Sequence, residues 1–212
     1  MKNEIALKST FAALFAAIIC VGVFLRIPVG PIPIALQNML CILTAVIAGG
    51  YIGFVPTAIF LLAGLIGLPV YSGGLVGPAA WMGPTGGFFP GYFLGALLAS
   101  LIAGKPAVQE KRTNPVTILR VSIAMIAGMV ILYYPGVLHF TVWALSNGKV
   151  PEGKSAIEYT MAACVLPFIP GDVIKTVVGI FVAIAVRPIF ARYVCSGGNK
   201  NAGHTLQIDE GK

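Results

Sequence analysis

Long apolar runs without a charged side chain divide this sequence into segments of membrane-spanning length. The runs are Phe11–Leu25, Ile27–Gly104, Val121–Ser146 and Thr176–Val186. Each helical crossing of a bilayer needs about 20 predominantly apolar residues. Prolines, glycine pairs and polar connections subdivide the runs and predict six spans, at residues 8–26, 34–50, 52–70, 85–104, 117–144 and 172–191. We therefore expect an all-α membrane protein in which six transmembrane helices form a compact bundle.

The domain organisation follows from the same pattern. Residues 1–193 are expected to form a single membrane domain, and the polar tail of residues 194–212 is expected to be disordered. Ser155–Leu166, in the long fifth connection, is predicted to form a short helix against the bundle, and Pro167 and Pro170 separate it from the last span.

Composition and charge support a membrane protein and argue against a nucleic-acid-binding protein. Hydrophobic residues make up 58% of the chain and charged residues only 10%, whereas a soluble domain carries about 25% charged residues. The net charge is +7, but the basic residues lie between the apolar runs, as topology-determining residues do. The positive-inside rule then predicts that both termini are cytoplasmic, in a multi-pass protein of the cell membrane.

Asp172 is the only acidic residue inside an apolar segment, and Lys175 follows it three positions later. Positions i and i+3 share one face of a helix. Because charges inside a membrane are costly, a chain that keeps them usually uses them in its function. The predicted topology places the pair near the outer surface, at the start of the last span. The alternative is a structural ion pair in which Asp172 caps the helix.

Small residues recur at helical spacing in two of the predicted spans. Gly83, Gly87, Gly91 and Gly95 form a row that predicts close packing of the fourth span on a neighbouring helix. The first span carries two overlapping pairs, Ala12/Ala16 and Ala13/Ala17. These pairs are compatible with packing inside the bundle or with docking of another membrane subunit.

The sequence offers little support for an enzyme. Residues 148–155 match the pattern of a phosphate-binding P-loop, but that motif requires a preceding buried strand, and here it follows an apolar helix. We therefore expect no nucleotide site, and any ATP-driven step must come from a partner chain. His139 has no second candidate metal ligand near it in the sequence, so neither a metal nor a cofactor is predicted, and no catalytic residue is identified.

Four motifs, in order along the chain, resemble those of the BioY family, the biotin-binding S components of energy-coupling factor (ECF) transporters. They are Pro31-Ile32-Pro33-Ile34-Ala35-Leu36-Gln37, Gly67-Leu68-Pro69-Val70-Tyr71-Ser72-Gly73-Gly74, Gly83-Pro84-Thr85-Gly86-Gly87 and Leu166-Pro167-Phe168-Ile169-Pro170-Gly171-Asp172-Val173-Ile174-Lys175. The resemblance covers roughly residues 1–193. The segment between Gly74 and Gly83 departs from it, because the family often has a second glycine pair there.

The resemblance implies a subunit that captures biotin from the outer side of the membrane. It also implies partners, namely a transmembrane coupling protein and a pair of cytoplasmic ATPases. S components dock on the coupling protein through small residues of the first helix, so the resemblance favours a docking role for Ala12, Ala13, Ala16 and Ala17.

The chemistry of biotin then suggests roles for individual residues. Asp172 is expected to accept hydrogen bonds from the ureido N–H groups, and Lys175 is expected to meet either the carboxylate or the ureido carbonyl. Further predicted site residues are the hydrogen-bonding Gln37 and Thr85, the aromatic Tyr71, Trp81 and Tyr92, and the glycines Gly73, Gly74 and Gly86.

Three alternatives to a biotin S component stay open at the level of sequence. One is an S component for another vitamin, which would keep the fold and change the pocket. Another is an integral membrane enzyme that uses Asp172 and Lys175. The third is a membrane scaffold whose glycine and alanine rows serve assembly alone.

Overall fold

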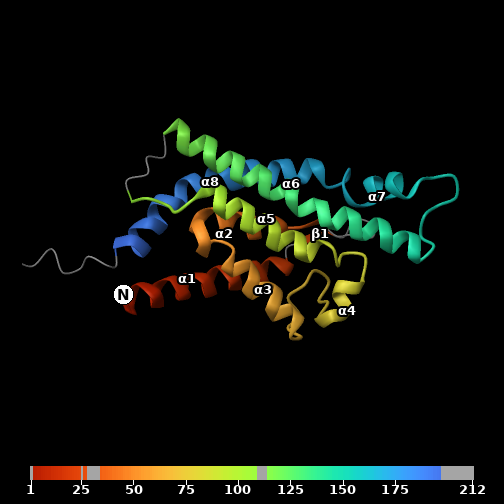
Figure 1. Cartoon of the computed structure of the whole chain (residues 1–212), viewed down its shortest axis with the longest axis horizontal. Helices are drawn as coiled ribbons and strands as arrows, with labels where there is room; N and C mark the ends of the chain where they lie inside the picture. Colours follow the sequence, from red (N-terminus) through yellow and green to blue (C-terminus); the bar gives the residue numbers. More distant parts are fainter. Residues whose placement is uncertain (1, 25, 28–33, 109–113, 197–212) are drawn as a thin grey trace, which may run out of the picture.

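A computed structural model describes residues 2–24, 26–27, 34–108 and 114–196. Within these ranges the protein is a helical bundle, elongated along the direction of its longest helices (Figure 1). The helices are α1 (Lys2–Val21), α2 (Gln37–Ala48), α3 (Val55–Leu65), α4 (Gly77–Met82), α5 (Phe88–Ala103), α6 (Pro115–Ser146), α7 (Ala156–Cys164) and α8 (Ile169–Ser196), with single 3₁₀ turns at Gly22–Phe24 and Gly50–Ile52.

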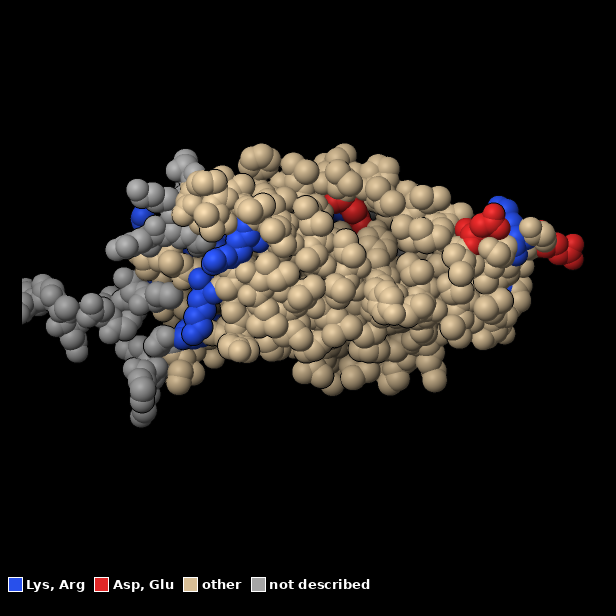
Figure 2. Space-filling model, turned by 45° about the horizontal axis from the view of Figure 1, so that its top comes forward, with Lys and Arg blue, Asp and Glu red and all other residues tan. Residues whose placement is uncertain are grey.

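Figure 1 shows α2 and α5 in the middle of the bundle, with α1 and α3 on one side and α6 and α8 on the other. The start of α1 and the end of α8 lie at the same end of the molecule. Lys8, Lys105 and Arg192 belong to the segments that meet there, and Figure 2 shows basic side chains around it. We call this the basic end. The opposite end, which carries α4 and α7, is the loop end.

The helix boundaries follow local capping rules. Asn114 caps α6 by accepting from the Val116 N–H, and proline follows at the first helical position, where its missing N–H costs nothing. Ser155 and Glu158 form a capping box at the start of α7. The predicted short helix at 155–166 is thus present as α7.

The lengths of the apolar helices differ from the predicted spans. Among the described residues, α6 and α8 are long and apolar enough to cross a membrane by themselves, and four other apolar helices are shorter. The helix α2 is about 18 Å long by helical rise, compared with about 30 Å for the hydrocarbon core. It ends early because Gly49 adopts a φ of 59° at its C-cap, which favours glycine.

Two elements were not predicted from the sequence. Arg26–Ile27 and Ile34–Ala35 pair as two-residue antiparallel strands, β1 and β2. The short α4 lies in the segment between Gly74 and Gly83, for which the sequence predicted no helix. Residues 28–33, between the first two predicted spans, lie outside the described residues, as does the tail from residue 197.

The glycine row packs α5 against α6, as the sequence predicted. A Cβ on Gly91 would lie 2.2 Å from the Leu132 carbonyl oxygen, and one on Gly95 would lie 2.5 Å from the Gly128 carbonyl oxygen. No larger residue fits at these positions without moving the α6 backbone. The row is therefore used inside the bundle, where close backbone approach strengthens packing.

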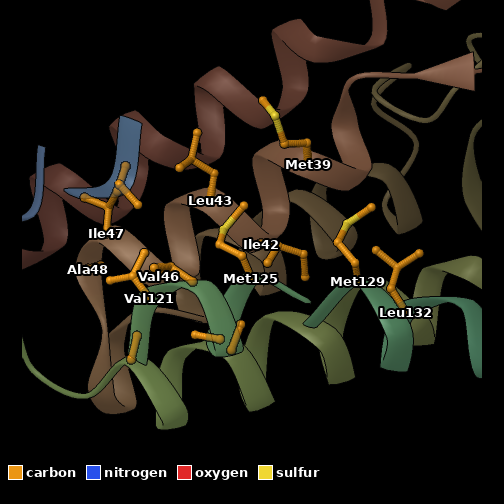
Figure 3. Close-up of a cluster of buried hydrophobic side chains, with 14 of the residues drawn as sticks. Met39, Ile42, Leu43, Val46, Ile47, Ala48, Val121, Met125, Met129 and Leu132 are labelled. Atoms are coloured by element: carbon orange, nitrogen blue, oxygen red, sulfur yellow. The ribbon is translucent and has the colours of Figure 1, made fainter. Parts of the chain in front are cut away.

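The main core lies between α2 and α6 (Figure 3). Ile42 and Val46 of α2 point toward Met125 and Val121 of α6. All four are buried with no exposed surface. This contact holds α2 against the first half of α6.

Arg187 is fully buried in α8, near the basic end. Its guanidinium donates to the Val46 carbonyl in the last turn of α2 and, at 3.0 and 3.3 Å, to the Ala103 and Gly104 carbonyls at the end of α5. Carbonyls in the last turn of a helix have no partner within that helix. Arg187 lies within the predicted last span, and its side chain joins the C-terminal ends of two helices.

Candidate functional site

The polar centre of the bundle is formed by Asp172 and Lys175 in the first two turns of α8. Their side chains form an ion pair and have exposed fractions of 7% and 14%, respectively. Asp172 lies near the N-terminus of α8, where the helix dipole stabilises a negative charge. The pair predicted from the i, i+3 spacing is therefore present.

Two side chains from other helices complete this centre. The Asn38 amide nitrogen of α2 lies 3.1 and 3.2 Å from the two carboxylate oxygens of Asp172. The Tyr133 hydroxyl of α6 donates to Asp172 Oδ2. Three helices thus converge on one carboxylate. We call Asn38, Tyr133, Asp172 and Lys175 the polar network.

All three protons of the Lys175 ammonium have acceptors in this structure. Besides Asp172, the Nζ atom donates to the Asn38 side-chain oxygen at 3.0 Å and to the Ala35 carbonyl at 3.1 Å. An ammonium group has three donors and no acceptor. Lys175 is therefore satisfied by the protein itself, and a ligand that engages it must replace one of these partners.

Tyr133 also determines how deep the polar network lies. It stands in the middle of α6, with residues 134–146 between it and the end of that helix at the loop end. Thirteen residues of α-helix span about 20 Å. The α6 contact therefore places the Asp172–Lys175 pair inside the bundle, about 20 Å along α6 from its end at the loop end. The expected position of the pair near the outer surface of a membrane stays a prediction.

A small cavity of about 50 Å³ borders the polar network. It is lined by Ala35, Asn38, Ser72, Thr85, Phe88, Phe89, Tyr92, Leu132, Tyr133, Cys164 and Phe168. The buried Ser72 hydroxyl has no hydrogen-bond partner among the described residues. An apolar slot with a few convergent polar groups is the usual form of a small-molecule site.

A groove on the flank of the bundle also reaches the polar network. It runs between α6 and α8, has a volume of about 540 Å³, and includes Tyr133 and Asp172 among otherwise mostly apolar residues such as Ile126, Val173 and Val177. Figure 2 shows an acidic group in a hollow midway along an uncharged flank. The whole Asp172 residue, backbone included, is only 5% exposed.

Some predicted site residues lie at the cavity and others stand behind it. Thr85 and Tyr92 line the cavity. Tyr71 is fully buried, donates to the Leu61 carbonyl at 2.6 Å and accepts from the Trp81 indole at 3.1 Å. Tyr71 and Trp81 both pack on Phe89, which is a wall residue of the cavity. They therefore support the aromatic wall from behind.

Gln37 points away from the polar network. Its side chain is 1% exposed and donates to the Val70 carbonyl at 2.7 Å and to the Ile19 carbonyl at 3.4 Å. The contact joins α2 to α1 and to the segment after α3. Its neighbour Asn38 makes the contacts with Asp172, because successive helix positions are rotated by about 100°.

The predicted glycines serve the protein backbone in two ways. Gly73 and Gly74 have positive φ values of 93° and 72°, which favour glycine. A Cβ on Gly86 would lie 1.7 Å from the Trp81 carbonyl oxygen, and one on Gly87 would lie 2.2 Å from His139 Cβ. The Gly86–Gly87 pair thus lets the segment before α5 pack tightly on α6, where His139 Nε2 also lies 2.9 Å from the Gly83 carbonyl oxygen.

The alanine pairs of α1 face two different environments. Ala12 and Ala16 are 7% and 3% exposed and pack inside the bundle. Ala13 and Ala17 are exposed. Of the predicted docking residues, only Ala13 and Ala17 offer a surface to another subunit in this structure.

Asn38, like Gln37, is an uncharged polar residue near the start of the second predicted span, where the sequence is compatible with a hydrogen bond to another helix or to a ligand. Tyr133 was missed as a site residue. It could have been found by asking which polar side chains in the apolar spans lack a partner in their own helix. Among the described residues, no group of three His, Cys, Asp or Glu side chains could hold a metal ion.

Comparison with known proteins gives a consistent result. Residues 1–192 match the family described as the BioY family. The biotin transporter BioY of Rhodobacter capsulatus is 34% identical over 180 residues, which cover 84% of this chain and 90% of the relative. That of Thermotoga maritima is 32% identical over 178 residues, covering 84% and 94%.

A solved structure is also similar. The crystal structure at 2.1 Å of the S-component for biotin from an ECF-type ABC transporter superposes with a TM-score of 0.67. It shares 25% sequence identity, and the alignment covers 88% of this chain and 94% of that chain.

Proposed function

The chain belongs to the BioY family, and from that premise we propose that it is the biotin-binding S component of an ECF transporter. It captures biotin from the outer side of the cytoplasmic membrane and delivers it inward when coupled to a transmembrane protein and two ATPases. It is a transport subunit and has no ATPase of its own. The polar network beside the aromatic cavity is the observation that carries this proposal.

The polar network matches the functional groups of biotin. The ureido ring offers two N–H donors and one carbonyl acceptor, and the valeryl tail ends in a carboxylate. Asp172 accepts hydrogen bonds from the ureido N–H groups. These groups take the place of Asn38 or Tyr133 as donors to its carboxylate. Lys175 supplies a cation for the ureido carbonyl or the tail carboxylate. The buried Ser72 hydroxyl and Thr85 are further hydrogen-bonding groups on the cavity wall.

The cavity must enlarge when biotin enters. Its volume of about 50 Å³ is well below the roughly 300 Å³ at the lower end of small-molecule pockets. The segment between α3 and α5 supplies Ser72 and Thr85 to the cavity wall. We assign the required movement to this segment, because both residues reach the cavity from outside the long helices of the bundle.

The membrane arrangement is part of the same proposal. Six apolar segments cross the bilayer, the shorter helices together with their flanking turns, with the basic end cytoplasmic and the loop end outside. The concentration of lysine and arginine at the basic end supports this orientation. The exposed pair Ala13/Ala17 on α1 supports docking of the coupling protein at this face.

Biotin calorimetry with the purified chain in detergent tests the proposal. Charge-assisted hydrogen bonds are worth about 1.5–3 kcal/mol, so we expect Asp172→Asn to weaken biotin binding about 10- to 100-fold. Glu152→Gln, at an exposed acidic residue of the loop end, is the control and should bind like the wild type. Equal affinity in Asp172→Asn and the wild type would remove Asp172 from the site.

Two further measurements separate biotin transport from the alternatives. Thiamine and riboflavin should fail to displace labelled biotin, whereas displacement would indicate another vitamin. Mass spectrometry of the bound ligand should recover intact biotin, because a transport subunit does not transform its substrate. Recovery of a chemically altered ligand would indicate an enzyme instead.

A further inference from the structure

A second cavity lies at the basic end, far along the bundle from the polar network. Its volume is about 420 Å³. It is lined by Lys8, Ala48, Gly49, Tyr51, Ile52, Lys105, Pro106, Phe190 and Val194. The lining residues come from α1, the α2–α3 turn, the segment after α5 and the last turns of α8. The part of the lining that the structure describes contains no acidic residue.

The helix ends around this cavity are already neutralised. The C-termini of α2 and α5 both lie here, and a helix C-terminus carries a partial negative charge. Arg187 is committed to their carbonyls at Val46, Ala103 and Gly104. Lys8 and Lys105 therefore bring two positively charged side chains to a region whose helix-end carbonyls already have a cationic partner.

The position of Lys105 is constrained by the turn opposite it. A Cβ on Gly50 would lie 3.0 Å from Lys105 Cγ, so the lysine stem lies directly against this glycine. Gly50 has a φ of 59°. The lysine stem thus packs on the α2–α3 turn. Lys105 lines the cavity from the end of α5, and Lys8 lines it from α1.

The remaining walls are apolar or amphipathic. Phe190 and Val194 of α8 are 6% and 4% exposed, and Ile52 lines the side next to α3. Tyr51 is 76% exposed, as is typical of a tyrosine at the level of lipid headgroups. The cavity therefore combines two cations, a phenol and an apolar wall.

We propose that this cavity binds the headgroup of an anionic phospholipid. Lys8 and Lys105 hold the phosphate from two sides, Tyr51 meets the glycerol or headgroup hydroxyls, and one acyl chain follows Phe190 and Val194. Basic cavities between helices on the cytoplasmic side of a membrane are suited to anionic headgroups. The apolar wall distinguishes a lipid from free phosphate as the occupant.

Native mass spectrometry of the full chain in detergent tests this site, with dioleoyl phosphatidylglycerol as the probe and dioleoyl phosphatidylcholine as the neutral comparison. Each lysine near the membrane surface strengthens binding of an anionic lipid about fivefold. We expect Lys8→Gln and Lys105→Gln each to weaken phosphatidylglycerol binding about fivefold, and the double variant about 25-fold. Phosphatidylcholine binding should not change.

The matched control is Lys149→Gln/Lys154→Gln, at two exposed lysines of the loop end, which should bind phosphatidylglycerol like the wild type. Retained biotin binding in the Lys8/Lys105 double variant shows that it is folded. Unchanged phosphatidylglycerol binding in that folded variant overturns the proposal. Soluble glycerol 3-phosphate that binds as tightly as the lipid also overturns it, because the site would then recognise the phosphate alone.

Discussion

Asn38 donates from its side-chain amide to both carboxylate oxygens of Asp172, 134 positions later in the chain, at 3.1 and 3.2 Å. The same side chain accepts from Lys175 through its oxygen at 3.0 Å. Asn38 therefore bridges the two members of an ion pair and fixes their geometry relative to α2. A ligand that competes for Asp172 or Lys175 must loosen this bridge, which couples ligand binding to the packing of α2 on α8.

Removal of Lys175 alone should destabilise the protein more than removal of both charges. Lys175→Met leaves the Asp172 carboxylate without its cation in a largely buried site, which costs about 3 kcal/mol of unfolding free energy. In Asp172→Asn/Lys175→Met no unpaired charge remains. Thermal unfolding in detergent should therefore rank the double variant above Lys175→Met. The reverse ranking would mean that the pair does not interact in the folded protein.

Tyr133→Phe should lower stability by about 1.5 kcal/mol, because Asp172 loses a hydroxyl donor and a hydrogen bond to a charged group contributes about that much. The next residue provides the control. Tyr134 is 67% exposed, so Tyr134→Phe should stay within about 0.5 kcal/mol of the wild type. Unfolding measurements that show equal effects for the two variants would contradict the assigned contact.

Arg187→Met should destabilise the basic end by about 3 kcal/mol. The methionine fills similar space but leaves the helix-end carbonyls of α2 and α5 without their donor in a buried position. Arg187→Lys keeps the charge but loses the planar fork of donors, so its stability should lie between that of the wild type and that of Arg187→Met. The control is Arg192→Met, which changes an exposed arginine of the same helix and should have little effect on the unfolding temperature. If Arg192→Met lowered the unfolding temperature as much as Arg187→Met, the loss would be a general effect of charge.

Gly87→Ala should cost about 1–3 kcal/mol, as overpacked substitutions generally do. Its methyl group would lie 2.2 Å from His139 Cβ and 2.5 Å from the Pro135 carbonyl oxygen. Gly83→Ala, in the same motif, meets its nearest atom at 3.5 Å and should be tolerated. The comparison of thermal unfolding between these two variants tests whether Gly87 is required by helix packing. Full stability of Gly87→Ala would show that α6 can move away from the segment before α5.

Local pattern predicted the helices but not their limits. The charge-free runs located the six apolar helices, and the glycine row predicted close packing that the structure confirms between α5 and α6. The ends of α2 and α3 were misjudged, because apolar residues continue past the helix into turns. The paired strands β1 and β2 carried no local pattern of their own, since two residues are too few to show an alternation.

The candidate site was only partly predictable for a geometric reason. Asp172 and Lys175 were found because unpaired charges are rare in apolar helices and because i, i+3 spacing defines their contact within one helix. Tyr133 was not found, and the contact of Asn38 with Asp172 was not predicted, since both contacts depend on the rotation of α2 and α6 about their own axes. Gln37 and Asn38 are adjacent in sequence, yet only one faces the polar network.

The sequence by itself determined that this protein is an apolar helical bundle with one buried ion pair, because hydrophobic pattern and charge placement are properties of the chain alone. Only the tertiary structure decided that Asn38, Tyr133 and Lys175 share the Asp172 carboxylate. It also decided that Ala12 faces inward while Ala13 faces outward, and that the buried Arg187 joins the ends of α2 and α5. Each of these facts depends on which faces of different helices meet. Side-chain packing across the bundle determines which faces meet.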